Sequence, residues 1–86
     1  MDLTEIRVKK LSTNSRLKGI ASVTFDSSFV VRGIKIVESS KGLFIAMPSE
    51  QDANGVFRDI AHPINIEFRE RLQNAILKKF DEIEEE

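Results

Sequence analysis

The stretch LKGIASVTFDSSFVVRGIKIV, residues 17–37, decides the fold. From Leu17 to Phe25 every second residue is apolar or glycine, which is the period of a strand with one buried face. The short polar break Asp26-Ser27-Ser28 leads into a second β-rich run, and this arrangement predicts an antiparallel hairpin. Gly33 interrupts the apolar alternation of the second run, and we predict a β-bulge there.

A further strand is predicted before this hairpin, over residues 3–11. Ile6 and Val8 fall on one side of it, and Arg7 and Lys9 on the other. That alternation is typical of a strand that packs its apolar side on a core and exposes its charged side to water.

After the hairpin, residues 43–47 form a continuous apolar run that stops at Pro48, which lacks the amide donor of a strand ladder. We predict a buried fourth strand here. Residues 49–55 contain the turn signal Asn54-Gly55 and predict an exposed loop, which leads to a short segment around residues 56–60.

One helix is predicted at the C-terminal end. Pro63 blocks continuation of the preceding segment, Asn65 is a good N-cap, and the helix is expected to run to about Glu82. Residues 81–86 form an acidic tail that we expect to fray. At about 100° per residue the apolar side chains make one stripe that would cover a sheet: Phe68, Leu72, Ala75, Ile76, Phe80 and Ile83.

These elements predict a single α+β domain over residues 1–86, with an antiparallel sheet of four to five strands and one C-terminal helix packed on it. One helix is a small cover for so many strands. We therefore expect a symmetric homodimer, formed through strand pairing or sheet packing. The alternative is a monomer with a charged sheet edge.

Composition narrows the classes of function. The chain has no cysteine, which excludes disulfides and thiolate sites and is usual for a cytoplasmic protein. No apolar run approaches the roughly 18 residues that span a membrane, and the acidic start is unlike a signal peptide. The formal charge of −1 includes five acids in residues 81–86, without which the remainder carries +4. A basic body favours a polyanionic partner.

Four segments resemble the SpoVG family of septation proteins in order and spacing: IASVTFD at residues 20–26, FVV at 29–31, GLFIAMPS at 42–49 and FRDIAHPIN at 57–65. The resemblance extends from Leu3 to about Phe80. It implies a homodimer that binds specific DNA sites and also RNA, and that regulates transcription and septation, as in cell division during sporulation. From the residues themselves we expect no enzymatic activity, no cofactor, no membrane insertion and no small-molecule substrate.

The resemblance also implies where nucleic acid would bind. In the family, basic residues follow the MPS motif and occupy the early part of the helix. Arg69 and Arg71 match that pattern in the helix, and Lys78 and Lys79 lie further along it. After MPS this chain departs from the pattern, because Glu50-Gln51-Asp52 stands where the family usually has a basic pair.

Spacing adds to these candidates. Arg71 and Lys78 lie within about 20° of each other around a helix, so that they could bridge successive phosphates. Arg7 and Lys9 would be about 6.8 Å apart along one face of a strand, a spacing that could follow a phosphate backbone. The alternative is that all these cations only solubilise the surface, and that the helical ones pair with nearby carboxylates: Glu70, Asp81 or Glu82.

Base-edge contacts and stacking need other residues. Gln73 and Asn74 are candidate readers of adenine edges if the helix approaches a major groove. Phe57, close to the loop, is the candidate for base stacking, although packing in the core is favoured. His62 is the only histidine, and its place before the helix favours a structural hydrogen bond over catalysis or zinc binding.

Two functions of different class are therefore compatible with the sequence. The first is a dimeric nucleic-acid-binding regulator that contacts phosphates through its cations. The second is a protein-interaction or scaffold module of the septation machinery, which would hold a partner at its sheet edge or at the acidic loop 50–52. No glycine-rich phosphate loop, metal motif or nucleophile supports an enzyme.

Overall fold

The predicted hairpin closes at Asp26 and Ser27, whose φ angles are both positive, at 51° and 53°. Two successive residues of this kind give a turn whose twist matches that of the flanking strands. In the computed structural model, which describes residues 1–83, this turn joins β2 (Leu17–Phe25) to β3 (Phe29–Ser39). The hairpin is the centre of the sheet.

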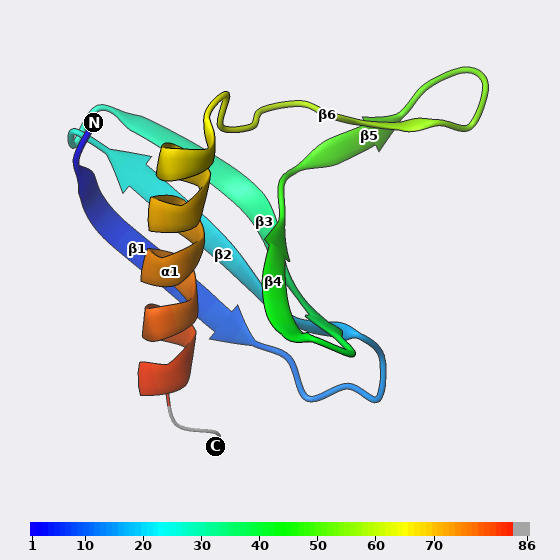
Figure 1. Ribbon diagram of the computed structural model, residues 1–86, viewed down its shortest axis with the longest axis horizontal. Coiled ribbons are helices and arrows are strands. Elements are labelled where there is room, and N and C mark those ends of the chain that lie inside the picture. The colour runs from blue at the N-terminus through cyan, green and yellow to red at the C-terminus, as the bar shows by residue number, and fades with distance from the viewer. Residues whose placement is uncertain (84–86) are drawn as a thin grey trace.

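A strand adds to each side of this hairpin. β1 (Leu3–Lys10) pairs with β2, and β4 (Gly42–Ala46) pairs with β3, all antiparallel, in the order β1-β2-β3-β4 (Figure 1). The α+β prediction of a four-stranded sheet with one helix is confirmed. Because consecutive strands are neighbours, the connections are short, the longest being the loop of residues 11–16 between β1 and β2.

The predicted bulge is also confirmed. Ala21 pairs with Ile34 and Val23 pairs with Val31, so one residue of β2 faces two residues of β3, Arg32 and Gly33. Gly33 has a φ of 77°, a conformation that glycine adopts without a Cβ penalty.

The helix α1 (Ile66–Glu82) begins where the sequence predicts. The Asn65 side chain accepts a hydrogen bond from the amide of Phe68 at 2.7 Å, and the backbone leaves the helix at Ile83. Asp81 and Glu82 still belong to the helix, contrary to a tail that frays from residue 81. The fraying expected beyond them falls on residues 84–86, outside the described residues. No helix in residues 1–83 has the length and apolar character needed to cross a membrane.

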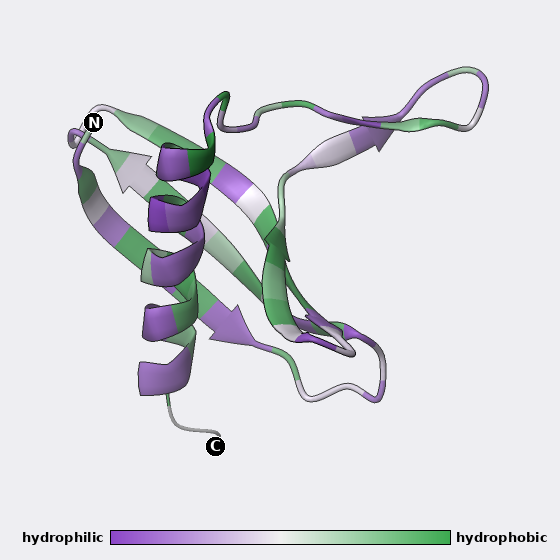
Figure 2. Cartoon of the chain, viewed as in Figure 1, coloured by the Kyte–Doolittle hydropathy of each residue, from purple (hydrophilic) through white to green (hydrophobic). Residues whose placement is uncertain are grey.

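The core lies between the helix and one face of the sheet, where the apolar surfaces of the two meet (Figure 2). Burying a large aliphatic side chain contributes roughly 1.5–3 kcal/mol, so these residues dominate stability. The buried set is Ala21, Val23, Phe25, Ile34, Ile36, Ile45, Met47, Leu72 and Ile76.

The helix lies closest to β1 and β4, the two edge strands, so the sheet curves around it (Figure 1). Two polar contacts fix it at those strands. The Gln73 side-chain oxygen accepts a hydrogen bond from the amide of Ile45 in β4 at 3.1 Å. The ammonium of Lys10 in β1 lies 4.6 Å from the centre of the Phe80 ring, a cation–π contact.

Two details of the sequence prediction are wrong. The fourth strand is an edge strand rather than a fully buried one, and its Phe44 remains 38% exposed. The segment predicted as a loop instead forms a second, two-stranded sheet of β5 (Ser49–Gln51) and β6 (Phe57–Asp59), which projects from the body (Figure 1). We call residues 49–59 the arm. All residues of its two strands are exposed.

Candidate nucleic-acid interface

Arg7 and Lys9 point outward from β1, as the alternation predicts. Ile6 and Val8 pack toward the core on the helix side, so the two cations lie on the opposite face of the sheet. Arg7 is partly engaged, because its Nε lies 3.0 Å from the carboxylate of Glu5 in an exposed ion pair. We call this outward side of the four-stranded sheet the open face.

β3 adds two cations to the open face, Arg32 and Lys35, which the sequence analysis did not name. Arg32 lines a shallow hollow of about 380 Å³ together with Arg7 and Lys9. Lys35 is exposed between the buried Ile34 and Ile36. The Gly33 bulge is the signal that could have identified them, because it shifts the strand by one residue and leaves both cations on one face.

The register gives the arrangement of these groups across the sheet. Lys9 is paired with Ile20 of β2, and Ile20 is paired with Lys35 of β3. Since neighbouring strands are about 4.8 Å apart, the two lysines flank Ile20 at a backbone separation of roughly 10 Å. Arg7 of β1 is paired with Ser22 of β2. On the other side of β2, Ser22 lies opposite the bulge of β3, which contains Arg32.

The four predicted cations of the helix lie on the other side of the molecule. Arg69, Arg71, Lys78 and Lys79 are all exposed, but the helix covers the inner face of the sheet. At about 100° per residue, Arg71 and Lys78 share one side of the helix, whereas Arg69 is about 160° from Arg71. The six predicted residues therefore do not form one site.

Acidic side chains are interspersed among these helical cations. The exposed Glu67, Glu70, Asp81 and Glu82 balance the four basic residues, so the formal charge of α1 is zero. Within residues 1–83 no carboxylate lies within 4.0 Å of any of the four, so the ion pairs considered as the alternative do not form there. The Arg71 guanidinium instead lies over the Phe68 ring at 5.7 Å.

The two candidate base readers have different environments. Asn74 is exposed on the helix, as a reader must be. Gln73 is half-buried, and its side-chain oxygen is bonded to the backbone of β4. Its prediction as a free reader is therefore wrong, because the side chain anchors the helix to the sheet.

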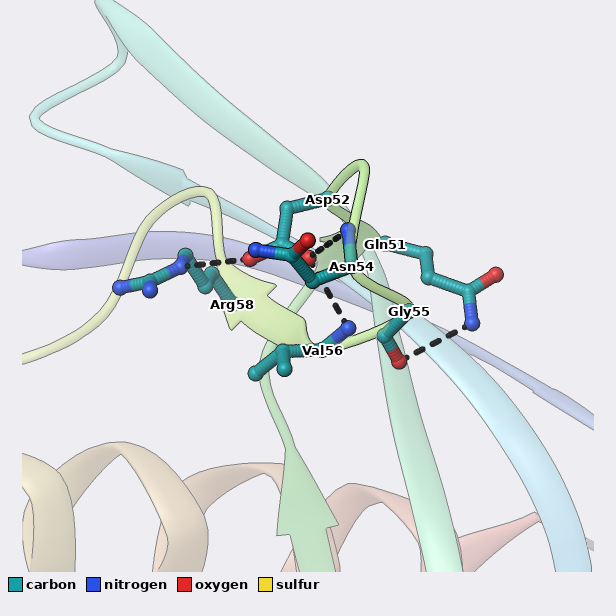
Figure 3. A network of polar contacts seen from close by, with 6 residues as sticks. All are labelled: Gln51, Asp52, Asn54, Gly55, Val56 and Arg58. Atoms are coloured by element: carbon teal, nitrogen blue, oxygen red, sulfur yellow. Dashed lines mark hydrogen bonds and ion pairs between the residues drawn. The ribbon is translucent and has the colours of Figure 1, made fainter.

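The arm holds one of its acidic residues, Asp52, in a local network of polar contacts. Asp52 accepts hydrogen bonds from the amides of Asn54 and Val56, at 2.9 and 3.0 Å, and its second oxygen lies 3.2 Å from the Nε of Arg58 (Figure 3). The Val56 amide bond and the Arg58 ion pair, with a smaller contribution from Asn54, lower the pKa of Asp52 below its ordinary value. The one basic side chain of the arm is thus engaged with its own turn.

Two more residues singled out from the sequence are Phe57, the candidate for base stacking, and His62, the single histidine. Phe57 is 69% exposed, so its expected packing in the core is wrong. The Nδ1 atom of His62 lies 2.9 Å from the carbonyl oxygen of Pro63, in keeping with a structural hydrogen bond. In the part of the chain from residue 1 to 83, no group of three or more potential ligand side chains is arranged to hold a metal ion.

Comparison with known proteins supplies the family. The profile of the SpoVG family matches residues 1–82. The chain belongs to the SpoVG family.

Several relatives in this family match over almost the whole chain. Proteins named "Putative septation protein SpoVG" are 51% identical in Thermoanaerobacter pseudethanolicus, over all of this chain and 94% of the relative, and 52% identical in Acetivibrio thermocellus, over 96% and 88%. The protein of that name from Staphylococcus aureus is 45% identical over 99% of this chain and 85% of its own. The resemblance of the four segments to SpoVG proteins is therefore confirmed.

Proposed function

We propose that this SpoVG-family protein is a nucleic-acid-binding regulator that acts in the cytoplasm on gene expression and septation. The observation that carries the proposal is the availability of its cations. Five of the six predicted ones, all except Arg7, have no carboxylate partner within residues 1–83. Cations held on a strand and a helix can neutralise phosphates without first breaking an ion pair. The proposal includes no catalytic step, cofactor or small-molecule substrate.

Random-sequence DNA and RNA pools test this function. We expect the protein to retain one or both pools in dilute buffer, with affinity falling steeply as salt rises, because each neutralised phosphate releases counterions. Filter retention or fluorescence anisotropy at low and near-physiological salt measures this. Failure to retain either pool in dilute buffer would remove nucleic-acid binding from the proposal.

We also propose that the protein acts as a homodimer joined through the arm and the segment that follows it. An isolated two-stranded sheet is marginally stable in water, yet this arm projects from the body with exposed apolar side chains. Patches of this kind mark protein contacts. We call these residues the apolar ridge: Val56, Phe57, Ile60, Ile64 and Ile66.

Two other routes to a dimer, sheet packing through the open face and strand pairing at β4, are less favourable. Sheet packing through the open face would bring Arg7, Lys9, Arg32 and Lys35 of two copies together, and like charges repel. Strand pairing at β4 meets the Gln73 side chain, which already occupies the amide of Ile45. Along the ridge, the exposed Arg58 and Asp59 carry opposite charges, so that two copies would not repel there as they would at the open face.

The same exposed ridge favours the second candidate function, a scaffold module of the septation machinery. In that case the ridge would contact a different protein instead of a second copy. A monomeric protein in solution that binds no nucleic acid would favour the scaffold, whereas a dimer that binds nucleic acid in a salt-dependent way would favour the regulator.

A further inference from the structure

Four charged residues of α1 form a symmetrical pattern along one side of the helix: Glu67, Arg71, Lys78 and Glu82. We call them the helix stripe. All four are exposed. At about 100° per residue, both carboxylates lie within about 30° of the line through the two cations. At 1.5 Å per residue, the cations are roughly 10 Å apart along the axis, and one carboxylate lies about 6 Å beyond each of them.

The helix stripe is directed away from the sheet. Leu72 and Ile76, the buried residues of α1, lie about 110–150° around the helix from the line of the two cations. A large ligand can therefore approach the whole length of the stripe without meeting the sheet.

Helix stability does not account for the carboxylate at the C-terminal end of the stripe. Glu82 lies in the last turn of α1, where the helix dipole disfavours a negative charge. Lys78 and Glu82 also stand in the less favourable order for a pair four residues apart. Within residues 1–83, neither Lys78 nor Arg71 has a carboxylate within 4.0 Å, and the Arg71 guanidinium lies over the Phe68 ring instead. The two carboxylates of the stripe are thus not neutralised by its cations.

This pattern limits how much of a phosphate backbone the helix attracts. The two cations span about three phosphate steps of a strand, at 3.4 Å each. A backbone that continues past either cation comes close to a carboxylate, and like charges repel. In water, two unit charges about 6 Å apart change an affinity by about threefold.

We infer that Glu67 and Glu82 confine the phosphate contacts of the helix to the segment between them, and so keep its affinity for nucleic acid of arbitrary sequence low. This inference rests on the proposed function and adds two specificity-determining residues to it. Phosphate contacts carry no sequence information, so a helix that makes few of them needs base contacts to bind tightly. Asn74, exposed beside the stripe between the two cations, is placed to make such a contact.

Two double variants with the same change of charge test the inference. The stripe variant is Glu67→Gln with Glu82→Gln, and the flank variant is Glu70→Gln with Asp81→Asn. Each removes one exposed carboxylate from either half of α1, but Glu70 and Asp81 lie about 70–90° from the line of the two cations. The probe is a pool of fluorescein-labelled random-sequence DNA duplexes, and fluorescence anisotropy measures its affinity as salt is raised.

We expect the stripe variant to bind the pool about three- to tenfold more tightly than the parent protein in dilute buffer. This gain should shrink toward physiological salt, where charges further apart than about 8 Å are largely screened. The flank variant should gain about twofold or less. Misfolding cannot imitate this result, because a damaged fold weakens binding. Sequencing of the retained duplexes gives a second readout, and the stripe variant should enrich particular sequences less than the parent does.

Two results would overturn the inference while nucleic-acid binding itself stands. Equal gains by the two variants would mean that net charge, and not the position of the carboxylates, sets the affinity. An unchanged affinity of the stripe variant in dilute buffer would mean that its carboxylates do not meet the backbone. If the parent protein and both variants fail to bind the pool in dilute buffer, the proposed function is refuted together with the inference.

Discussion

Gly33 shows how the backbone of one residue sets the charge of a surface. In a regular strand, residues 32 and 35 would point to opposite faces, because side chains alternate. The extra residue at the bulge shifts this alternation, so that Arg32 and Lys35 both point outward while Ile34 and Ile36 are fully buried. Both the core and the basic open face depend on this glycine.

Gly33→Ala should lower the free energy of unfolding by about 1–2 kcal/mol, because a residue with a Cβ is strained at a φ of 77°. The cost is conformational rather than steric, since the nearest atom to an added Cβ is that of Pro48, at 3.8 Å. Gly33→Asn should cost less, as asparagine tolerates this region better. Urea denaturation measures both, and equal losses for the two variants would contradict this account.

Single residues with a local role were predictable from the sequence. Asn65 was predicted as the N-cap and accepts the bond from the Phe68 amide, because capping depends on residues three apart. Gln73 was not predicted correctly. Its partner, the amide of Ile45, is 28 residues away, and nothing in the local pattern indicates that pairing.

At the scale of elements, the sequence predicted the helix and the four strands of the main sheet, the first three from their apolar period and the fourth from its continuous apolar run. It missed β5, because Ser49-Glu50-Gln51 has neither an apolar period nor β-favouring side chains. That strand exists because of the turn after it, where Asp52 bonds to the amides of Asn54 and Val56 and brings β6 alongside (Figure 3).

The turn of the arm should therefore depend on the ionised carboxylate of Asp52. The pKa of Asp52 is lower in the folded arm than in the unfolded chain. The stability that the ionised carboxylate contributes to the arm is therefore fully present above the unfolded pKa, and it is lost below about pH 4, as the pH falls through the folded pKa. NMR titration of the Asp52 side chain measures this pKa. Arg58→Gln should raise it only in part, because the Val56 amide bond remains.

A full return of the Asp52 pKa to its ordinary value in Arg58→Gln would mean that the ion pair alone lowers it.

At the scale of the whole molecule, the candidate site separates into two charged surfaces. The sequence predicted that Arg7 and Lys9 lie on the outward face of β1, because they alternate with Ile6 and Val8, which pack toward the helix. It did not show that the open face gathers four cations, because the contribution of β3 depends on its register with β2. It also did not show the apolar ridge. Its residues are of the types that usually form a core, and they are exposed because the arm projects from the body. We therefore expect tertiary placement, more than residue type, to determine where this chain binds.

The proposed dimer should make thermal stability depend on concentration, because association stabilises the folded state by mass action. Phe57→Ser with Ile64→Ser should give a monomer by light scattering, since these side chains are 69% and 90% exposed in the single chain and would be covered in the dimer. Val30→Ser, at an exposed apolar position on the open face, is the matched control and should leave the dimer intact. A parent protein of monomer mass at every concentration would contradict the dimer.

The hydrogen bond from the Ile45 amide to the Gln73 side chain also protects the edge strand β4 against aggregation. An exposed edge strand can pair with the edge strand of another copy, and repeated pairing of this kind builds fibrils. At β4 an incoming chain would have to displace the Gln73 side chain, which the helix delivers to the amide of Ile45. Protection of this edge against uncontrolled growth thus depends on the helix staying packed on the sheet.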